Sequence, residues 1–213
     1  MKKSPETSVN DARATRRGRP RTFDRDKALE QATLVFWKKG FEATSIVDLT
    51  DAIGIEAPSL YAAFGSKEAL YRKAVDCYVD RFQGAVWSNF LAAPTAREAV
   101  AAYLQDSATA LAGSSSEYPR GCMVTLANID SDAHPSLAVA VSSARSIAFD
   151  RLSSRIAAAV DDGELPLTTD VPARARFIQT VQSGMSLIAR DGADRSDLVK
   201  LANTAMSVWD LTA

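Results

Sequence analysis

The sequence predicts an all-α protein in which three short N-terminal helices precede a larger helical bundle. Three observations indicate this fold class. Apolar residues recur at helical spacing through most of residues 24–211. Capping residues, glycines and prolines divide this stretch into helix-length segments. No segment shows the alternation of a strand, a glycine-rich phosphate loop or an internal repeat.

The composition is typical of a soluble globular chain. Of the 213 residues, 46% are hydrophobic and 24% charged, and no apolar run approaches the roughly 20 residues that a membrane helix needs. No apolar segment follows the charges at the N-terminus, so we expect a cytoplasmic location. The two cysteines and the single histidine, His134, are too few for a disulfide framework or an ordinary zinc site. We therefore expect no metal, no cofactor and no membrane partner.

Positive charge is concentrated at the N-terminus, although the net charge of the chain is −1. Residues 1–21 contain seven Lys or Arg residues and two acidic residues, with no apolar period. We interpret this stretch as a disordered basic arm. Its last arginines either lie along the minor groove or the backbone of DNA or belong only to a solubilising tail. These are Arg16, Arg17, Arg19 and Arg21.

Three helices are predicted within residues 22–66, which we expect to form the first domain. Ser45 and Asp48 have the spacing of a capping box at the start of the second helix, and Gly54 ends it. The expected helical segments are 24–40, 45–54 and 57–64. The second and third have the spacing of a helix-turn-helix, whose second helix enters the major groove of DNA. Because many helical proteins contain such a corner, a purely structural role is the alternative.

A second domain is expected over residues 67–213. Its first helix is capped by Ser66 and continues with apolar residues to Ala85. Thr95 with Glu98 opens the next one as a second capping box. The later helices are expected at 95–111, 135–160, 171–189 and 195–211, with a short apolar segment at 122–129.

The run from Gly40 to Val75, GFEATSIVDLTDAIGIEAPSLYAAFGSKEALYRKAV, resembles the DNA-binding region of TetR-family regulators. The resemblance rests on these residues in the family's order and spacing: Gly40-Phe41, Thr44-Ser45, Asp48-Leu49, Gly54-Ile55, Leu60-Tyr61, Phe64 and Ser66-Lys67-Glu68-Ala69-Leu70. The remaining helices agree with the family only in number and length. The resemblance implies a dimeric repressor that binds an inverted-repeat operator in double-stranded DNA and is released by a small-molecule effector of unknown identity.

The resemblance implies DNA contacts for particular residues. Contacts to phosphates are implied for Thr44, Ser45, Tyr61 and Lys67. Sequence readout is implied for the exposed face of the third helix, at Ala57, Pro58, Ser59 and Ala62, with Glu56 beside them. Alanine and proline can contact thymine methyl groups but offer few hydrogen bonds to bases, so we expect sparse direct readout. A half-buried tyrosine without a DNA contact is the alternative for Tyr61.

The last two helices are implied to pair with their twofold mates. Small residues in two stripes would let helices approach closely. The first stripe, with Ala173 at its start, is Phe177, Val181, Gly184 and Ile188, and the second is Leu198, Ala202, Ala205 and Trp209. A helix pair inside the core of one chain is the alternative.

The middle helices are implied to enclose the effector pocket. The candidate lining residues are Tyr78, Phe82, Trp87, Tyr103, Cys122, Met123, Phe149 and Phe177. Only some of them are expected to face a ligand, because apolar residues on such helices more often pack in the core.

Cys122 lies in the segment PRGCMVTLA at a predicted junction between loop and helix. Backbone amides and nearby Arg120 could activate its thiol, which would make it a sensor. A Gly-Cys pair at this point resembles a subset of the family that responds to electrophiles or unsaturated acids. An inert buried cysteine is the alternative, and the residues favour it.

No constellation of nucleophile, acid-base pair or metal ligands is visible around His134, so we expect no enzyme. Three alternatives to the ligand-responsive repressor remain open. They are a DNA-binding dimer without an effector, an activator on the same scaffold, and a ligand-binding protein whose helix-turn-helix has lost its affinity for DNA.

Overall fold

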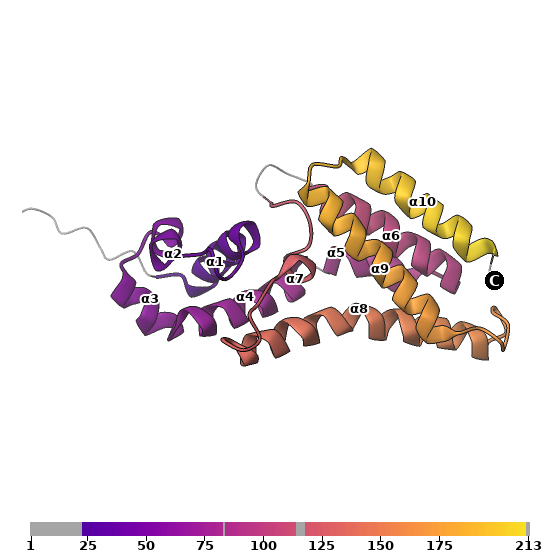
Figure 1. Ribbon diagram of the computed structural model, residues 1–213, viewed down its shortest axis with the longest axis horizontal. Coiled ribbons are helices and arrows are strands. Elements are labelled where there is room, and N and C mark those ends of the chain that lie inside the picture. Colours follow the sequence, from indigo (N-terminus) through magenta and orange to yellow (C-terminus); the bar gives the residue numbers. More distant parts are fainter. Residues whose placement is uncertain (1–22, 83, 114–117, 212–213) are drawn as a thin grey trace, which may run out of the picture.

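The computed structural model describes residues 23–82, 84–113 and 118–211, which form ten α-helices and no strand. The prediction of an all-α chain is therefore confirmed. Helices α1, α2 and α3 form a head at one end, the bundle lies at the other, and α4 runs between them (Figure 1). The basic arm, with Arg16, Arg17, Arg19 and Arg21, lies outside the described residues. None of the described helices is long and apolar enough to cross a membrane.

The head is organised around α1 (Arg25–Lys39). The carboxylate of Asp24 accepts hydrogen bonds from the backbone amides of Asp26 and Lys27, both at 3.1 Å, and so caps the helix start. The buried face of α1 includes Ala28, Ala32, Thr33, Phe36 and Trp37, and the helix packs on α2 and α4.

The corner between α2 (Ile46–Ile53) and α3 (Ala57–Phe64) is set by Gly54. Gly54 has φ 75° and ψ 41°, a left-handed conformation that glycine adopts at little cost. Leu49 and Leu60 are fully buried on the two sides of this corner. The predicted helix-turn-helix geometry is thus present, held by the head's own core.

Helix α4 (Lys67–Phe82) joins the head to the bundle, because it packs on α1 and also on α8. Within the helix predicted from Ser66 to Ala85, residue 83 lies outside the described residues; α4 ends at Phe82 on one side of it, and α5 (Gly84–Ala92) begins on the other. Helix α5 packs mainly on α6, where it buries Trp87 and Phe90.

The bundle consists of α5 and five further helices, which are α6 (Ala96–Leu111), α7 (Met123–Leu126), α8 (Pro135–Asp161), α9 (Val171–Arg190) and α10 (Arg195–Leu211). Helix α10 lies against α6 and α9 lies against α8 (Figure 1). The resulting core is continuous with that of the head.

The stripe predicted to pair α10 with a second copy is wrong. The side chains of Leu198, Ala202, Ala205 and Trp209 are all buried within one chain, where α10 packs on α6 and α9. The guanidinium of Arg174 lies 4.7 Å from the Trp209 ring centroid. Helix α10 needs an apolar face to join its own core, and this stripe supplies it.

Candidate DNA-binding surface and internal cavity

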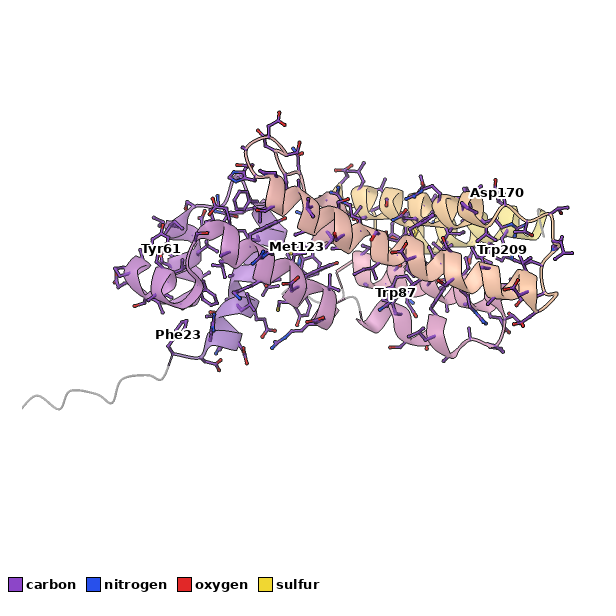
Figure 2. The ribbon with its side chains drawn as sticks, turned by 90° about the horizontal axis from the view of Figure 1, so that it is seen from below. Phe23, Tyr61, Trp87, Met123, Asp170 and Trp209 are labelled. Atoms are coloured by element: carbon purple, nitrogen blue, oxygen red, sulfur yellow. The ribbon has the colours of Figure 1, made fainter. Side chains whose placement is uncertain are left out.

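Helix α3 presents one face to the solvent and one to the head's core. Pro58, Ser59, Tyr61 and Ala62 are exposed, whereas Leu60 and Phe64 are buried. Ala57 is half-buried at the helix start. Tyr61 is 45% exposed and lies at the outer end of the head, opposite the end that carries Trp209 (Figure 2). The predicted readout residues therefore share an accessible helix face.

The predicted phosphate contact from the Thr44 side chain is wrong. Thr44 is only 1% exposed, and its hydroxyl donates a hydrogen bond of 2.6 Å to the carbonyl oxygen of Gly40. The hydroxyl thus satisfies the carbonyl where α1 ends. Its role is to join the end of α1 to the start of α2.

Ser45 is exposed, but its polar groups are held by Asp48 in the predicted capping box. The Ser45 amide donates to the Asp48 carboxylate at 2.9 Å, and the Asp48 amide donates to Ser45 Oγ at 3.1 Å. Hydrogen bonds from Lys39 and Ser45 lower the pKa of Asp48 to about 2. Backbone amides of Ile46 and Val47, in the first helical turn, have no partner within the helix and suit a phosphate better.

Lys67 stands at the first position of α4. Its ammonium lies 4.4 Å from the centroid of the Phe41 ring, a cation–π arrangement. The carboxylate of the adjoining Glu68 lies 4.0 Å from Nδ1 of His134, the residue just before α8. The His134 ring also packs edge-to-face against the Phe41 ring. Lys67 is half-buried and positioned by the head's core.

A cavity of about 510 Å³ lies between the head and the bundle. Four of the predicted pocket residues line it: Tyr78, Trp87, Tyr103 and Cys122. The Trp87 ring stacks on Tyr103 with a centroid distance of 4.6 Å. Burial is the main cause that raises the pKa values of both Tyr78 and Tyr103, so their hydroxyl groups stay protonated.

Three other predicted pocket residues do not line this cavity. Met123 is buried at the start of α7. Phe149 is half-buried and is covered by the guanidinium of Arg176 at 3.9 Å. Phe177 is 39% exposed on the outer face of α9. Each side chain points elsewhere because its helix packs with a different face toward the cavity, and the Phe82 side chain lies outside the described set.

The cavity also contains polar residues that the sequence did not single out. Glu30 and Arg81 form an ion pair of 2.9 Å between α1 and α4. Arg145 donates from Nε to the Val124 carbonyl at 3.0 Å, and its other bonds go to the carbonyls of Thr125 and Ala127. Ser107 on α6 and Gln179 on α9 also line the cavity. Both lie on helices with apolar spacing, so a polar residue on the inward face of such a helix is a sequence signal for the cavity.

Trp37 brings the head directly to the cavity. Its indole Nε1 donates to the Gly121 carbonyl at 2.9 Å, and its own carbonyl accepts from Arg190 at 3.0 Å. No sequence signal predicted these contacts, because the partners are 84 and 153 residues away.

Cys122 is the residue after Gly121, and its side chain is only 5% exposed. Its amide donates to Ser186 Oγ at 2.8 Å, and its Sγ accepts the Thr125 amide at 3.4 Å, which caps α7. The guanidinium of Arg120, expected to activate the thiol, donates instead to the Gly192 carbonyl at 2.8 Å.

An apolar surface remains on the outside of α9 and α10. It comprises the exposed side chains of Phe177 and Leu187 on α9 and of Leu201 and Val208 on α10, together with the exposed Gly184 of α9. Val181 and Ile188, also predicted for a dimer contact, are half-buried against the core. We name this surface the α9–α10 face.

Three comparisons with known proteins agree with this architecture. Residues 28–74 match the family described as bacterial regulatory proteins, tetR family. The HTH-type transcriptional repressor ComR of Escherichia coli is 36% identical over 195 residues, which cover 91% of this chain and 92% of ComR. The uncharacterized HTH-type transcriptional regulator YezE of Bacillus subtilis is 30% identical over 91% of this chain and 100% of YezE.

Among solved structures, this chain is similar to a cysteine mutant of the TetR family transcriptional regulator CifR complexed with 26-base-pair operator DNA. The TM-score is 0.83 at 38% sequence identity, over 90% of this chain and 100% of that one. The similarity therefore spans both the head and the bundle.

Proposed function

Because this chain belongs to the TetR family of bacterial regulatory proteins, we propose that it is a transcriptional repressor controlled by a small molecule. It binds an inverted-repeat operator as a dimer, and a ligand in the cavity releases it. We further propose that it acts in the cytoplasm and catalyses no reaction. An activator, or a dimer that needs no ligand, remains the second candidate on the same scaffold.

Binding to DNA is supported by the exposed face of α3 and the groups beside it. Tyr61 offers a hydroxyl to a phosphate, and Lys67 offers a charge at the start of α4. Pro58 and Ala62 offer apolar contacts to thymine methyl groups. One head reads only a few base pairs, so specificity requires two heads at a fixed separation. The α9–α10 face is the surface we propose for that pairing.

One observation supports the ligand response: side chains of α1, in the head, and of α4, which joins the head to the bundle, line the cavity. Trp37 and Glu30 belong to α1, and Tyr78 and Arg81 belong to α4, yet all four line the cavity. A ligand that fills the cavity therefore contacts the two helices that position α3. The ligand releases DNA to the extent that it binds more tightly to the conformation of the dimer in which the separation of the two heads does not fit the operator.

The proposal is tested by selecting binding sites from random double-stranded DNA with the purified dimer. We expect an inverted repeat, bound more weakly by Tyr61→Phe and Lys67→Ala with unchanged sequence preference. Lys67→Ala should reduce the salt dependence of binding by about one phosphate contact. Asp51→Asn, an exposed change on α2, serves as the control for altered charge. A folded dimer without sequence preference would refute the proposal.

A further inference from the structure

The hydroxyl of Ser107 has no hydrogen-bond partner among the described residues, although it is buried. Ser107 is 1% exposed and lines the cavity from α6. Two residues further on, Thr109 shows the usual alternative, since its hydroxyl donates to the Gln105 carbonyl at 3.2 Å. Burying an unpaired hydroxyl is unfavourable, so the atom takes its partner from within the cavity, water in the free protein or a polar atom of a bound ligand.

Aromatic rings line the same cavity as this hydroxyl. Tyr103 is one helical turn before Ser107 on α6, and its ring stacks on Trp87. Trp37 and Tyr78 contribute a further edge-to-face pair with centroids 4.9 Å apart. The surroundings of Ser107 therefore favour a molecule with a flat or apolar body.

The charged residues that line the cavity already have partners. Glu30 and Arg81 neutralise each other, and the Arg145 guanidinium is directed to three backbone carbonyls at the end of α7. The phenols of Tyr78 and Tyr103 remain uncharged because burial raises their pKa values. The Arg145 charge has no acidic partner among the described residues, but its Nε and one terminal nitrogen already donate to carbonyls, so an anion would lose its hydration for an incomplete pairing. A cation would meet no free carboxylate among the described lining residues, because Glu30 pairs with Arg81.

From these three observations we infer that the effector is a small uncharged molecule with an apolar body and one oxygen or nitrogen atom that hydrogen-bonds to Ser107. This inference rests on the proposed function, because it assumes that the cavity binds the effector. Ser107 is then the residue that distinguishes such molecules from hydrocarbons of equal shape. A volume of about 510 Å³ accommodates a substituted aromatic ring or a short chain.

Three probes of similar size separate the alternatives: acetophenone has an acceptor oxygen, ethylbenzene has none, and benzoate is an anion. Binding is measured by calorimetry on the full chain without DNA. We expect acetophenone to bind about three- to tenfold more tightly than ethylbenzene, and benzoate to bind least. Ethylbenzene is the more hydrophobic of the two neutral probes, so this preference cannot come from apolar transfer.

Ser107→Ala should abolish the preference for acetophenone. It should leave the unfolding midpoint of the free protein equal or higher, because it removes a buried hydroxyl that has no partner among the described residues. Ser153→Ala is the matched control, since Ser153 Oγ on α8 is also buried without a partner in the described part of the chain but does not line the cavity. That variant should keep the preference.

Equal binding of the two neutral probes, a preference that survives Ser107→Ala, tightest binding of benzoate, or no binding of any probe would each overturn the inference. Operator binding is measured in parallel. If the operator is bound but the probe pattern fails, the repressor proposal stands without this ligand class. If the probe pattern holds but no operator is selected, the ligand class stands and the repressor proposal fails.

Discussion

The indole of Trp37 on α1 donates a hydrogen bond to the main-chain carbonyl of Gly121, 2.9 Å away, and this bond is buried. It connects the head to the loop that precedes Cys122, at the wall of the cavity. A movement of that wall on ligand binding must therefore either move α1 or break this bond. The bond is a direct physical connection between the ligand site and the DNA-binding unit.

Trp37→Phe should keep an aromatic ring but leave the Gly121 carbonyl unpaired. We expect the free energy of unfolding in urea to fall by about 1–3 kcal/mol. The ratio of operator affinities without and with saturating ligand should also fall, because the connection to α1 is weakened. Trp87→Phe is the control, as Trp87 lines the cavity from α5. It should change ligand affinity but preserve that ratio; equal losses in both variants would argue against a role for the Trp37 bond.

Gly121→Ala should be much more harmful than Gly163→Ala. Both glycines have φ 78°, so both substitutions introduce the same backbone strain. An added Cβ at Gly121 would lie 2.8 Å from the Ser186 carbonyl oxygen, whereas one at Gly163 would meet none of the described residues within 4 Å. Thermal or urea unfolding should show an extra loss of about 1–3 kcal/mol at Gly121. Similar losses of stability at the two positions would mean that the loop containing Gly121 moves to accommodate the added Cβ.

Gly184→Trp should separate the dimer into folded monomers. None of the described atoms lies within 4 Å of a Cβ at Gly184, so this part of the chain can accept a larger side chain, while a close contact between two α9–α10 faces cannot. Sedimentation velocity at micromolar concentration measures the change, and circular dichroism confirms folding. Val139→Trp, at an exposed position of α8, should remain a dimer. A dimeric Gly184→Trp protein would move the interface to another surface.

The head should lose stability in acid through Asp48. The pKa of this carboxyl falls from 3.8 to about 2 on folding, first because Lys39 donates a hydrogen bond to it. The stabilisation is therefore complete above about pH 4 and is lost as the pH falls towards 2. Asp48→Asn and Lys39→Met should both flatten this part of the stability profile, relative to Asp51→Asn. An unchanged profile in both variants would show that the capping box does not carry the effect.

Cys122→Ser should preserve operator binding, because serine caps a short helix at least as well as cysteine. If methyl vinyl ketone releases the wild-type protein from the operator, we expect Cys122→Ser to stay bound in its presence. Cys77→Ser should be released like the wild-type protein. The thiol adds across the carbon–carbon double bond, forming a sulfur–carbon bond and transferring its proton to the carbon beside the carbonyl. Mass spectrometry measures the adduct. Undiminished release of Cys122→Ser would assign Cys122 a structural role.

Local signals in the sequence determined the head. The capping box of Ser45 and Asp48, the left-handed Gly54 and the inward pair Leu60 and Phe64 all lie within a short stretch, where residue spacing fixes helix ends and buried faces. The family resemblance came from the same stretch. The boundaries of the long helices were also largely predictable, because caps and glycines mark them.

Only the tertiary structure decided which apolar face meets which partner. Periodicity shows that α10 has an apolar stripe, but not whether Leu198 and Trp209 meet their own core or a second copy of the chain. The burial of Thr44, the Trp37–Gly121 bond and the unpaired Ser107 hydroxyl likewise depend on segments far apart in sequence. Such contacts form because helices pack in three dimensions, and no local pattern of residues encodes the distance between them.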